Sequence, residues 1–138
     1  MNAQMTTSYD SYETSPLQLV KSDLKYFNVQ YLRTLNLITA TGWSITDDAW
    51  IKYYQLLADI ESQMIHSDEL TVYFKLELFN TSSARYILKI INRLNKGHAN
   101  GKKVKIYWST QVENEAETMD ASLELSGLCD FPFEIYAC

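Results

Sequence analysis

Residues 70–94 read LTVYFKLELFNTSSARYILKIINRL, and this segment joins two different periodicities without a linker. In residues 70–79 apolar and polar side chains alternate, which is typical of a β-strand. In residues 84–94 apolar side chains recur at helical spacing. A strand that leads directly into a helix leaves the first backbone N–H groups of the helix unpaired, at the positive end of its dipole. The junction is therefore a candidate anion site, and it carries three hydroxyls, on Thr81, Ser82 and Ser83.

The three hydroxyls have two interpretations. A phosphoryl group on one of them would place its charge where the helix N-terminus already favours it. Asn, Thr and Ser are also ordinary N-cap residues, so each of them could serve only to stabilise the helix. The residues alone leave both interpretations open.

The predicted helix after the junction is amphipathic at about 100° per residue. Its apolar face consists of Ile87, Ile90, Ile91 and Leu94, and its opposite face of Arg85, Lys89, Arg93 and Lys96. The basic face is either a docking stripe for an acidic partner, beginning beside Thr81, or an ordinary solvated surface. No Asp or Glu lies between Glu77 and Glu113, and no Lys or Arg follows Lys105. This layout predicts a basic side and an acidic side, which suits oriented docking onto another protein.

The remaining patterns predict an alternation of strands and helices. We expect strands at residues 26–31 and 35–39, a helix over about 45–64, a strand at 104–108, a helix at 113–125 and a strand at 131–136. Arg33-Thr34 forms the expected hairpin turn, and Gly97 and Gly101 bracket an expected loop. The order β-β-α-β-α-β-α-β indicates a single-domain α/β sandwich with a mixed β-sheet.

Composition limits the domain organisation and the function classes. The chain has 138 residues, which is enough for one domain with a real core, and residues 1–25 are predicted to be a flexible polar lead-in to a domain at 26–138. A net charge of −5 argues against general nucleic-acid binding. No apolar run approaches the roughly 18 residues of a membrane span, and the first residues lack the pattern of a signal peptide. Cys129 and Cys138 are the only cysteines, so we expect a cytoplasmic protein without a disulfide framework.

No pattern of catalytic or metal-binding residues is recognisable. His66 and His98 stand alone, without zinc-ligand spacing to a cysteine, and the glycine-rich loops of nucleotide sites are missing from the sequence. We therefore expect no catalytic residues, no cofactor and no metal. A small enzyme with an unrecognised site would need a pocket lined by titratable groups.

The segment Leu76-Glu77-Leu78-Phe79-Asn80-Thr81-Ser82-Ser83, with the helix after it, resembles the SiaC family of bacterial regulatory phosphoproteins. Further matches in the same order are Gly42-Trp43-Ser44, Tyr54-Gln55, Ile106-Tyr107-Trp108 and Asp130-Phe131-Pro132-Phe133. The resemblance covers roughly residues 26–137. That family is similar in fold to the anti-sigma-factor antagonists, the STAS-like domains, which are phosphorylated on a hydroxyl at a strand-to-helix junction.

The resemblance implies a phosphorylation-controlled partner switch without catalysis of its own. A cognate Ser/Thr kinase would phosphorylate Thr81, a phosphatase would reset it, and one form would dock onto an effector such as a diguanylate cyclase in biofilm and cyclic-di-GMP signalling. In this interpretation Asn80, Ser82 and Ser83 shape the helix N-terminus, and Arg85 and Lys89 lie on the docking side. The alternative is a constitutive protein-binding scaffold in which Thr81 is only a helix cap.

Overall fold

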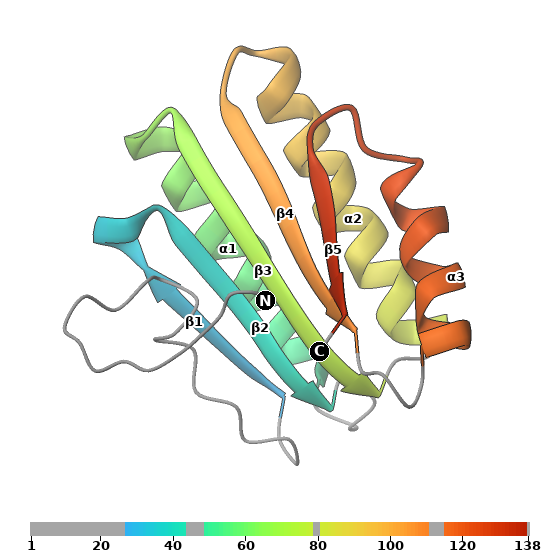
Figure 1. Ribbon diagram of the computed structural model, residues 1–138. Helices are drawn as coiled ribbons and strands as arrows, with labels where there is room; N and C mark the ends of the chain where they lie inside the picture. Colours follow the sequence, from blue (N-terminus) through green and yellow to red (C-terminus); the bar gives the residue numbers. More distant parts are fainter. Residues whose placement is uncertain (1–26, 44–48, 79–80, 111–114, 138) are drawn as a thin grey trace, which may run out of the picture.

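The computed structural model describes residues 27–43, 49–78, 81–110 and 115–137. The elements are β1 (Asn28–Leu32), a 3₁₀ turn (Arg33–Leu35), β2 (Leu37–Trp43), α1 (Ala49–His66), β3 (Glu69–Leu78), α2 (Thr81–Ala99), β4 (Lys103–Thr110), α3 (Glu115–Ser126) and β5 (Phe133–Ala137). This order confirms the predicted alternation of strands and helices (Figure 1). The predicted lead-in at residues 1–25 and the predicted helix start near Thr46 lie outside the described residues.

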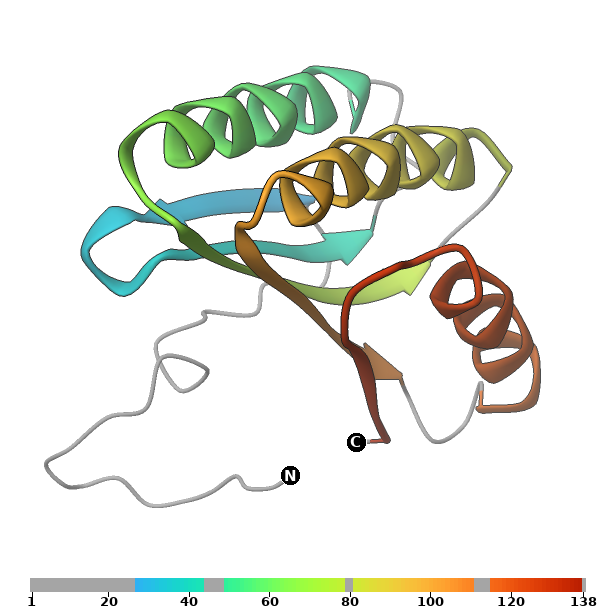
Figure 2. The ribbon, with the colours of Figure 1, turned by 90° about the horizontal axis from the view of Figure 1, so that it is seen from above.

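The five strands form one mixed sheet whose order, β1-β2-β3-β4-β5, is also their order in the chain. The hairpin β1–β2 is antiparallel, and β2, β3, β4 and β5 run parallel to one another. Helices α1 and α2 lie side by side over one face of the sheet (Figure 2), and α3 packs beside β4 and β5. The α/β class and the mixed sheet are therefore as predicted.

The core lies between the sheet and the helices. Alternate residues of β3 point into it, and these are Leu70, Val72, Phe74 and Leu76. The apolar face predicted for α2 is fully buried against them, and its members are Ile87, Ile90, Ile91 and Leu94. Burial of each such side chain contributes about 1.5–3 kcal/mol to the stability of the fold. These residues of β3 and α2 are therefore a main source of stability at the centre of the domain.

The hairpin connection differs from the predicted two-residue turn. Arg33–Leu35 forms one turn of 3₁₀ helix, and Asn36 follows it with a φ of 54°. Asparagine adopts this left-handed conformation more readily than most residues. The turn is therefore longer than predicted, and β2 begins at Leu37 rather than at Leu35.

Helix α2 continues to Ala99, beyond the repeat of residues 84–94 that predicted it, and the prediction of a loop bounded by Gly97 is wrong. Gly97 lies inside the helix, and only Gly101, with a φ of 92°, belongs to the turn that follows. A Cβ atom at position 97 would lie 2.8 Å from Cε of Met64 in α1. A side chain at position 97 would displace the flexible end of Met64, so this glycine fits the close packing of α1 on α2 and does not mark a break in the helix.

A buried amide connects α1 to the hairpin. Gln63 is only 1% exposed, and its Oε1 accepts a hydrogen bond of 2.6 Å from the Tyr31 hydroxyl. Its Nε2 donates to Oδ1 of Asn36 at 2.6 Å and to the carbonyl of Glu69 at 2.8 Å. One side chain therefore holds together β1, the turn after it and the start of β3.

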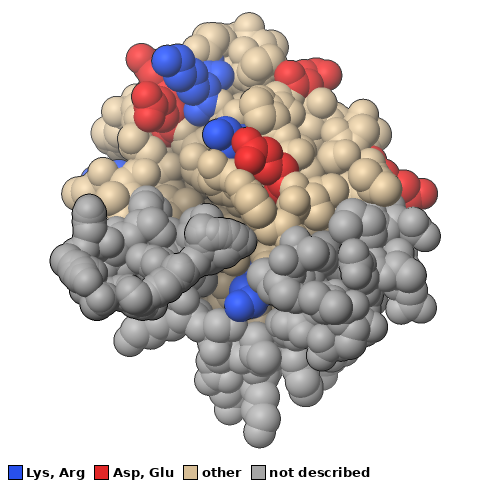
Figure 3. Space-filling model, in the orientation of Figure 1, with Lys and Arg blue, Asp and Glu red and all other residues tan. Residues whose placement is uncertain are grey.

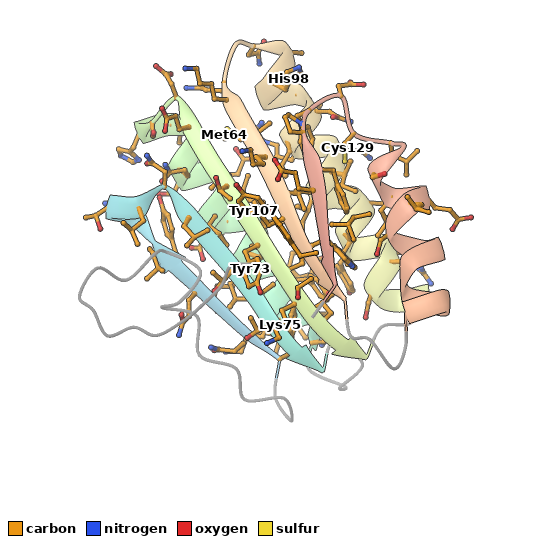
Figure 4. All side chains as sticks on the ribbon, viewed as in Figure 1. Met64, Tyr73, Lys75, His98, Tyr107 and Cys129 are labelled. Atoms are coloured by element: carbon orange, nitrogen blue, oxygen red, sulfur yellow. The ribbon has the colours of Figure 1, made fainter. Side chains whose placement is uncertain are left out.

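The sheet face turned away from α1 and α2 carries polar and aromatic side chains. Tyr73 of β3 stands opposite Tyr107 of β4 in the sheet register, with Lys75 two residues further along β3 (Figure 4). Among the described elements, no helix covers this face (Figure 2).

Candidate functional site

The junction between β3 and α2 is the first part of the site. Strand β3 ends at Leu78 and α2 begins at Thr81, three residues before the helical repeat of residues 84–94. Thr81 therefore stands in the first helical turn, where backbone N–H groups have no acceptor within the helix and the dipole is positive. Asn80 lies outside the described residues, and the side chains of Thr81 and Ser82 are not described.

Ser83, unlike the exposed basic residues of α2, is buried. Its side chain is 1% exposed, because it turns inward in the first turn of α2. A kinase cannot reach a hydroxyl that is enclosed in this way without unfolding the helix end. This burial in the first turn is compatible with the expected role of Ser83 in shaping the helix N-terminus, which stays a prediction.

The basic face predicted for α2 is divided by the structure. Arg85 and Lys89 are exposed, as the sequence predicts. Arg93 instead donates two hydrogen bonds to Glu61 of α1, one of them from Nη2 to Oε1 at 3.0 Å. The hydrogen bond from Arg93 lowers the pKa of Glu61, and the same bond raises the pKa of Arg93. Arg93 is thus engaged within the domain, whereas Arg85 and Lys89 are exposed and form no ion pair with a described residue.

An exposed aromatic group lies beside these two basic residues. Trp50 and Tyr54 belong to the apolar repeat that predicted α1, yet each is 50% exposed. Their rings meet edge to face with centroids 6.0 Å apart, and Tyr54 meets Tyr86 of α2 in the same manner. The ammonium group of Lys89 lies 5.8 Å from the ring centroid of Tyr54 and 5.6 Å from that of Tyr86, within the range of cation–π attraction.

We call this group the α1–α2 surface, and its members are Trp50, Ile51, Tyr54, Arg85, Tyr86 and Lys89. Sequence reasoning found its basic members but not its aromatic ones. The signal was present in the spacing, since Trp50 and Tyr54 are four residues apart and neighbour each other on a helix. Their hydrophobic character indicated the core instead.

Two basic residues outside α2 form ion pairs within the domain. Lys102 pairs with Asp68 at 3.1 Å, and Lys105 pairs with Glu134 at 3.6 Å. On the face seen in Figure 3, several described basic side chains accordingly lie against acidic ones. The acidic side chains at residues 113–120 all lie outside the described ones, so the acidic side stays a prediction.

Other features of the described chain offer little chemistry. An open hollow of about 590 Å³ lies at the other end of the sheet, and its lining includes His98, Lys102 and Lys103. Within the described ranges, no three His, Cys, Asp or Glu residues are grouped so that they could hold a metal ion. Burial raises the pKa of Cys129 to about 11, so its thiol is a poor nucleophile.

No helix among the described residues is long and apolar enough to cross a membrane.

Comparison with known proteins identifies the family and agrees with the fold. The family model described as "SiaC family regulatory phosphoprotein" matches residues 28–138. The chain belongs to the SiaC family. No curated protein gives a significant match to it.

Solved structures of SiaC share the fold of this SiaC-family chain. One match is to the crystal structure of the diguanylate cyclase SiaD in complex with its activator SiaC from Pseudomonas aeruginosa, with a TM-score of 0.77, 21% identity, and coverage of 86% of this chain and 98% of the other. SiaC of Pseudomonas aeruginosa matches with a TM-score of 0.74, 22% identity, and coverage of 86% and 96%. At these identities the agreement concerns the fold.

Proposed function

We propose that this chain is a cytoplasmic, non-catalytic partner switch in which Thr81 is the phosphoacceptor. A cognate Ser/Thr kinase adds the phosphoryl group and a phosphatase removes it. In one of the two forms the domain at residues 26–138 docks onto an effector, such as a diguanylate cyclase in cyclic-di-GMP signalling.

The observation that carries this proposal is the position of Thr81 at the first residue of α2, in a family of regulatory phosphoproteins. A phosphate there lies at the positive end of a helix of 19 residues, where the dipole favours a negative charge. The burial of Ser83 leaves Thr81 and Ser82 as the hydroxyls to be distinguished at this junction.

The chemistry of the switch follows from the added charge. A phosphoryl group carries about −1.5 to −2 charges at neutral pH, together with strong acceptor oxygens. On a surface that closes against a partner, such a group must be desolvated or paired, so it changes the affinity of a close-packed interface. The relative named above supports the choice of effector, because there SiaC is the activator of a diguanylate cyclase.

The first test is peptide mass spectrometry on the chain purified from its native cells, with the phosphatase inhibited. We expect one phosphoryl group on Thr81. The Thr81→Ala variant should lose it, whereas the matched Ser82→Ala variant should keep it. Thr81→Asp should reproduce the effect of the phosphate only in part, because one carboxylate has less charge and fewer acceptor oxygens.

The second test measures cyclic-di-GMP synthesis by a diguanylate cyclase from the same genome, with the phosphorylated and unphosphorylated chain added. The switch requires that only one form changes the cyclase rate. A constitutive scaffold would behave differently: Thr81→Ala would lose about 1 kcal/mol of stability and leave partner affinity unchanged.

A further inference from the structure

Three large apolar side chains of the α1–α2 surface are exposed to solvent. Trp50, Ile51 and Tyr54 are each 50% exposed within the first two turns of α1. Isolated exposed apolar residues are common and need no explanation, but a contiguous group marks an interaction site far more often. By comparison, Ile65 is 76% exposed but lies near the other end of the same helix, away from this group.

The exposed rings rest on a rigid aromatic base. Tyr86 stacks on fully buried Tyr53, with centroids 5.0 Å apart and an angle of 7° between the rings. Tyr53 in turn packs against buried Phe27 at 4.6 Å. The outer ring of Tyr54 contacts this base through Tyr86, so it loses little conformational freedom when a partner covers it.

The charged members of the α1–α2 surface, Arg85 and Lys89, are both cations with exposed side chains. Among the described residues, no carboxylate forms an ion pair with Arg85 or Lys89, although the nearby Arg93 is paired with Glu61. Arg85 and Lys89 are four residues apart, so both charges border the apolar group on the same side of α2. A partner that covers the rings gains most if it brings carboxylates to these two cations.

The surface is also close to the proposed phosphosite. Arg85 and Lys89 lie about 6 and 12 Å along the helix axis from Thr81, at 1.5 Å per residue. A charge on Thr81 therefore acts on these cations at distances comparable to the screening length of about 8–10 Å. Helices α1 and α2 begin at the same end of the sheet (Figure 2). Trp50 and Tyr54 belong to the first two turns of α1 and Thr81 to the first turn of α2, so all three residues lie toward that end.

We infer that the α1–α2 surface docks a segment of a partner protein in which apolar side chains are bordered by Asp or Glu. The inference rests on the proposed function and adds to it the surface and the chemistry of the effector segment. Trp50, Ile51 and Tyr54 provide apolar contact area on the ordered rings, and Arg85 and Lys89 select for acidic flanks.

The test places the photo-crosslinking amino acid p-benzoylphenylalanine at Tyr54 of the full chain, expressed in its native cells. The matched control carries the same group at Ile65. Irradiation should yield a crosslink from position 54, and peptide sequencing should map it to a segment with apolar and acidic residues. Arg85→Glu with Lys89→Glu should reduce the yield on the order of tenfold. Lys96→Glu, an exposed cation further along α2, should leave the yield unchanged.

Several results would overturn the inference. They are equal yields at positions 54 and 65, no crosslink at position 54, a mapped segment without carboxylates, and a crosslink to a second copy of this chain. The Thr81→Asp variant separates this inference from the switch. If crosslinking at position 54 persists unchanged in Thr81→Asp and in Thr81→Ala, the docking surface stands and the switch is wrong. If Thr81 is phosphorylated in cells and position 54 captures nothing, the site of docking is wrong.

Discussion

Tyr54 of α1 and Tyr86 of α2 meet edge to face, with ring centroids 6.0 Å apart and planes inclined at 74°. The pair joins the two helices at the surface, while the stack of Tyr86 on Tyr53 continues into the core. The same rings that are exposed to a partner therefore also contribute to the packing of α1 against α2.

Removing each ring should affect stability to a different extent. Tyr86→Ala takes away the stack on Tyr53 and should cost about 2 kcal/mol, which is below the cost of a fully buried aromatic residue. Tyr54→Ala should cost less than about 1 kcal/mol, because that ring is half exposed. Urea unfolding of both single variants and the double variant should give a coupling energy of about 0.5–1.5 kcal/mol. Strict additivity would contradict the contact.

Replacing Gln63 by Leu should destabilise the domain strongly. The change leaves the Tyr31 hydroxyl, the Asn36 amide oxygen and the Glu69 carbonyl without the partner that each now has. A buried polar group deprived of its partner costs about 1–3 kcal/mol, and these three groups are only partly buried, so we expect a total loss of about 3 kcal/mol in the free energy of unfolding. The matched control is Gln55→Leu at an exposed position of α1, which should change stability by about 0.5 kcal/mol or less. A similar loss in both variants would contradict this role for Gln63.

The ion pair between Glu61 and Arg93 should contribute modestly and depend on pH. Both side chains are partly exposed, so Glu61→Gln should cost at most about 1 kcal/mol at neutral pH and low salt. Because the folded-state pKa of Glu61 is lowered, its stabilising effect is present above the unfolded pKa and is lost as pH falls through the folded pKa. The difference between wild type and Glu61→Gln should therefore vanish in acid and shrink in high salt. Glu124→Gln, at an exposed position that forms no ion pair with a described residue, should show neither trend.

Cys129 should react slowly with alkylating reagents. Burial, and to a lesser extent the charge of Asp130, raises the pKa of its thiol from 9.0 to about 11. At pH 8 this leaves ~100-fold less thiolate than an ordinary cysteine has, and the thiolate is the reactive species. The measurement is the alkylation rate of the Cys138→Ser variant, folded and in denaturant. Equal rates in the two conditions would show that the domain does not protect this thiol.

Much of the fold could be predicted from the sequence because the central elements are strongly periodic. The alternation in residues 70–76 and the helical repeat in α2 both contribute to the core, where burial enforces a single pattern. The ends of elements were less predictable. Gly97 was interpreted as a loop residue, whereas its role depends on Met64, which lies 33 positions earlier in the chain.

The site was predicted less completely for a similar reason. Thr81 could be located from the local change of periodicity, and α2 does begin there. Local patterns do not reveal that Arg93 is paired with Glu61 and is therefore not available to a partner on the basic face. Nor do they reveal that Trp50 and Tyr54 point outward, because hydrophobic character is the same in a core and at a docking surface.

The match between strand order and chain order has a consequence for biosynthesis. Each strand from β2 onward pairs with the strand that the ribosome produced just before it, separated by one helix or by the hairpin turn. No strand has to wait for a partner made much later, so the sheet can grow in the direction of translation. The short separations between paired strands also lower the entropic cost of each closure. Once β3 and α2 have emerged, the nascent chain has most of its core and the first residue of α2, Thr81, before the last two strands are made.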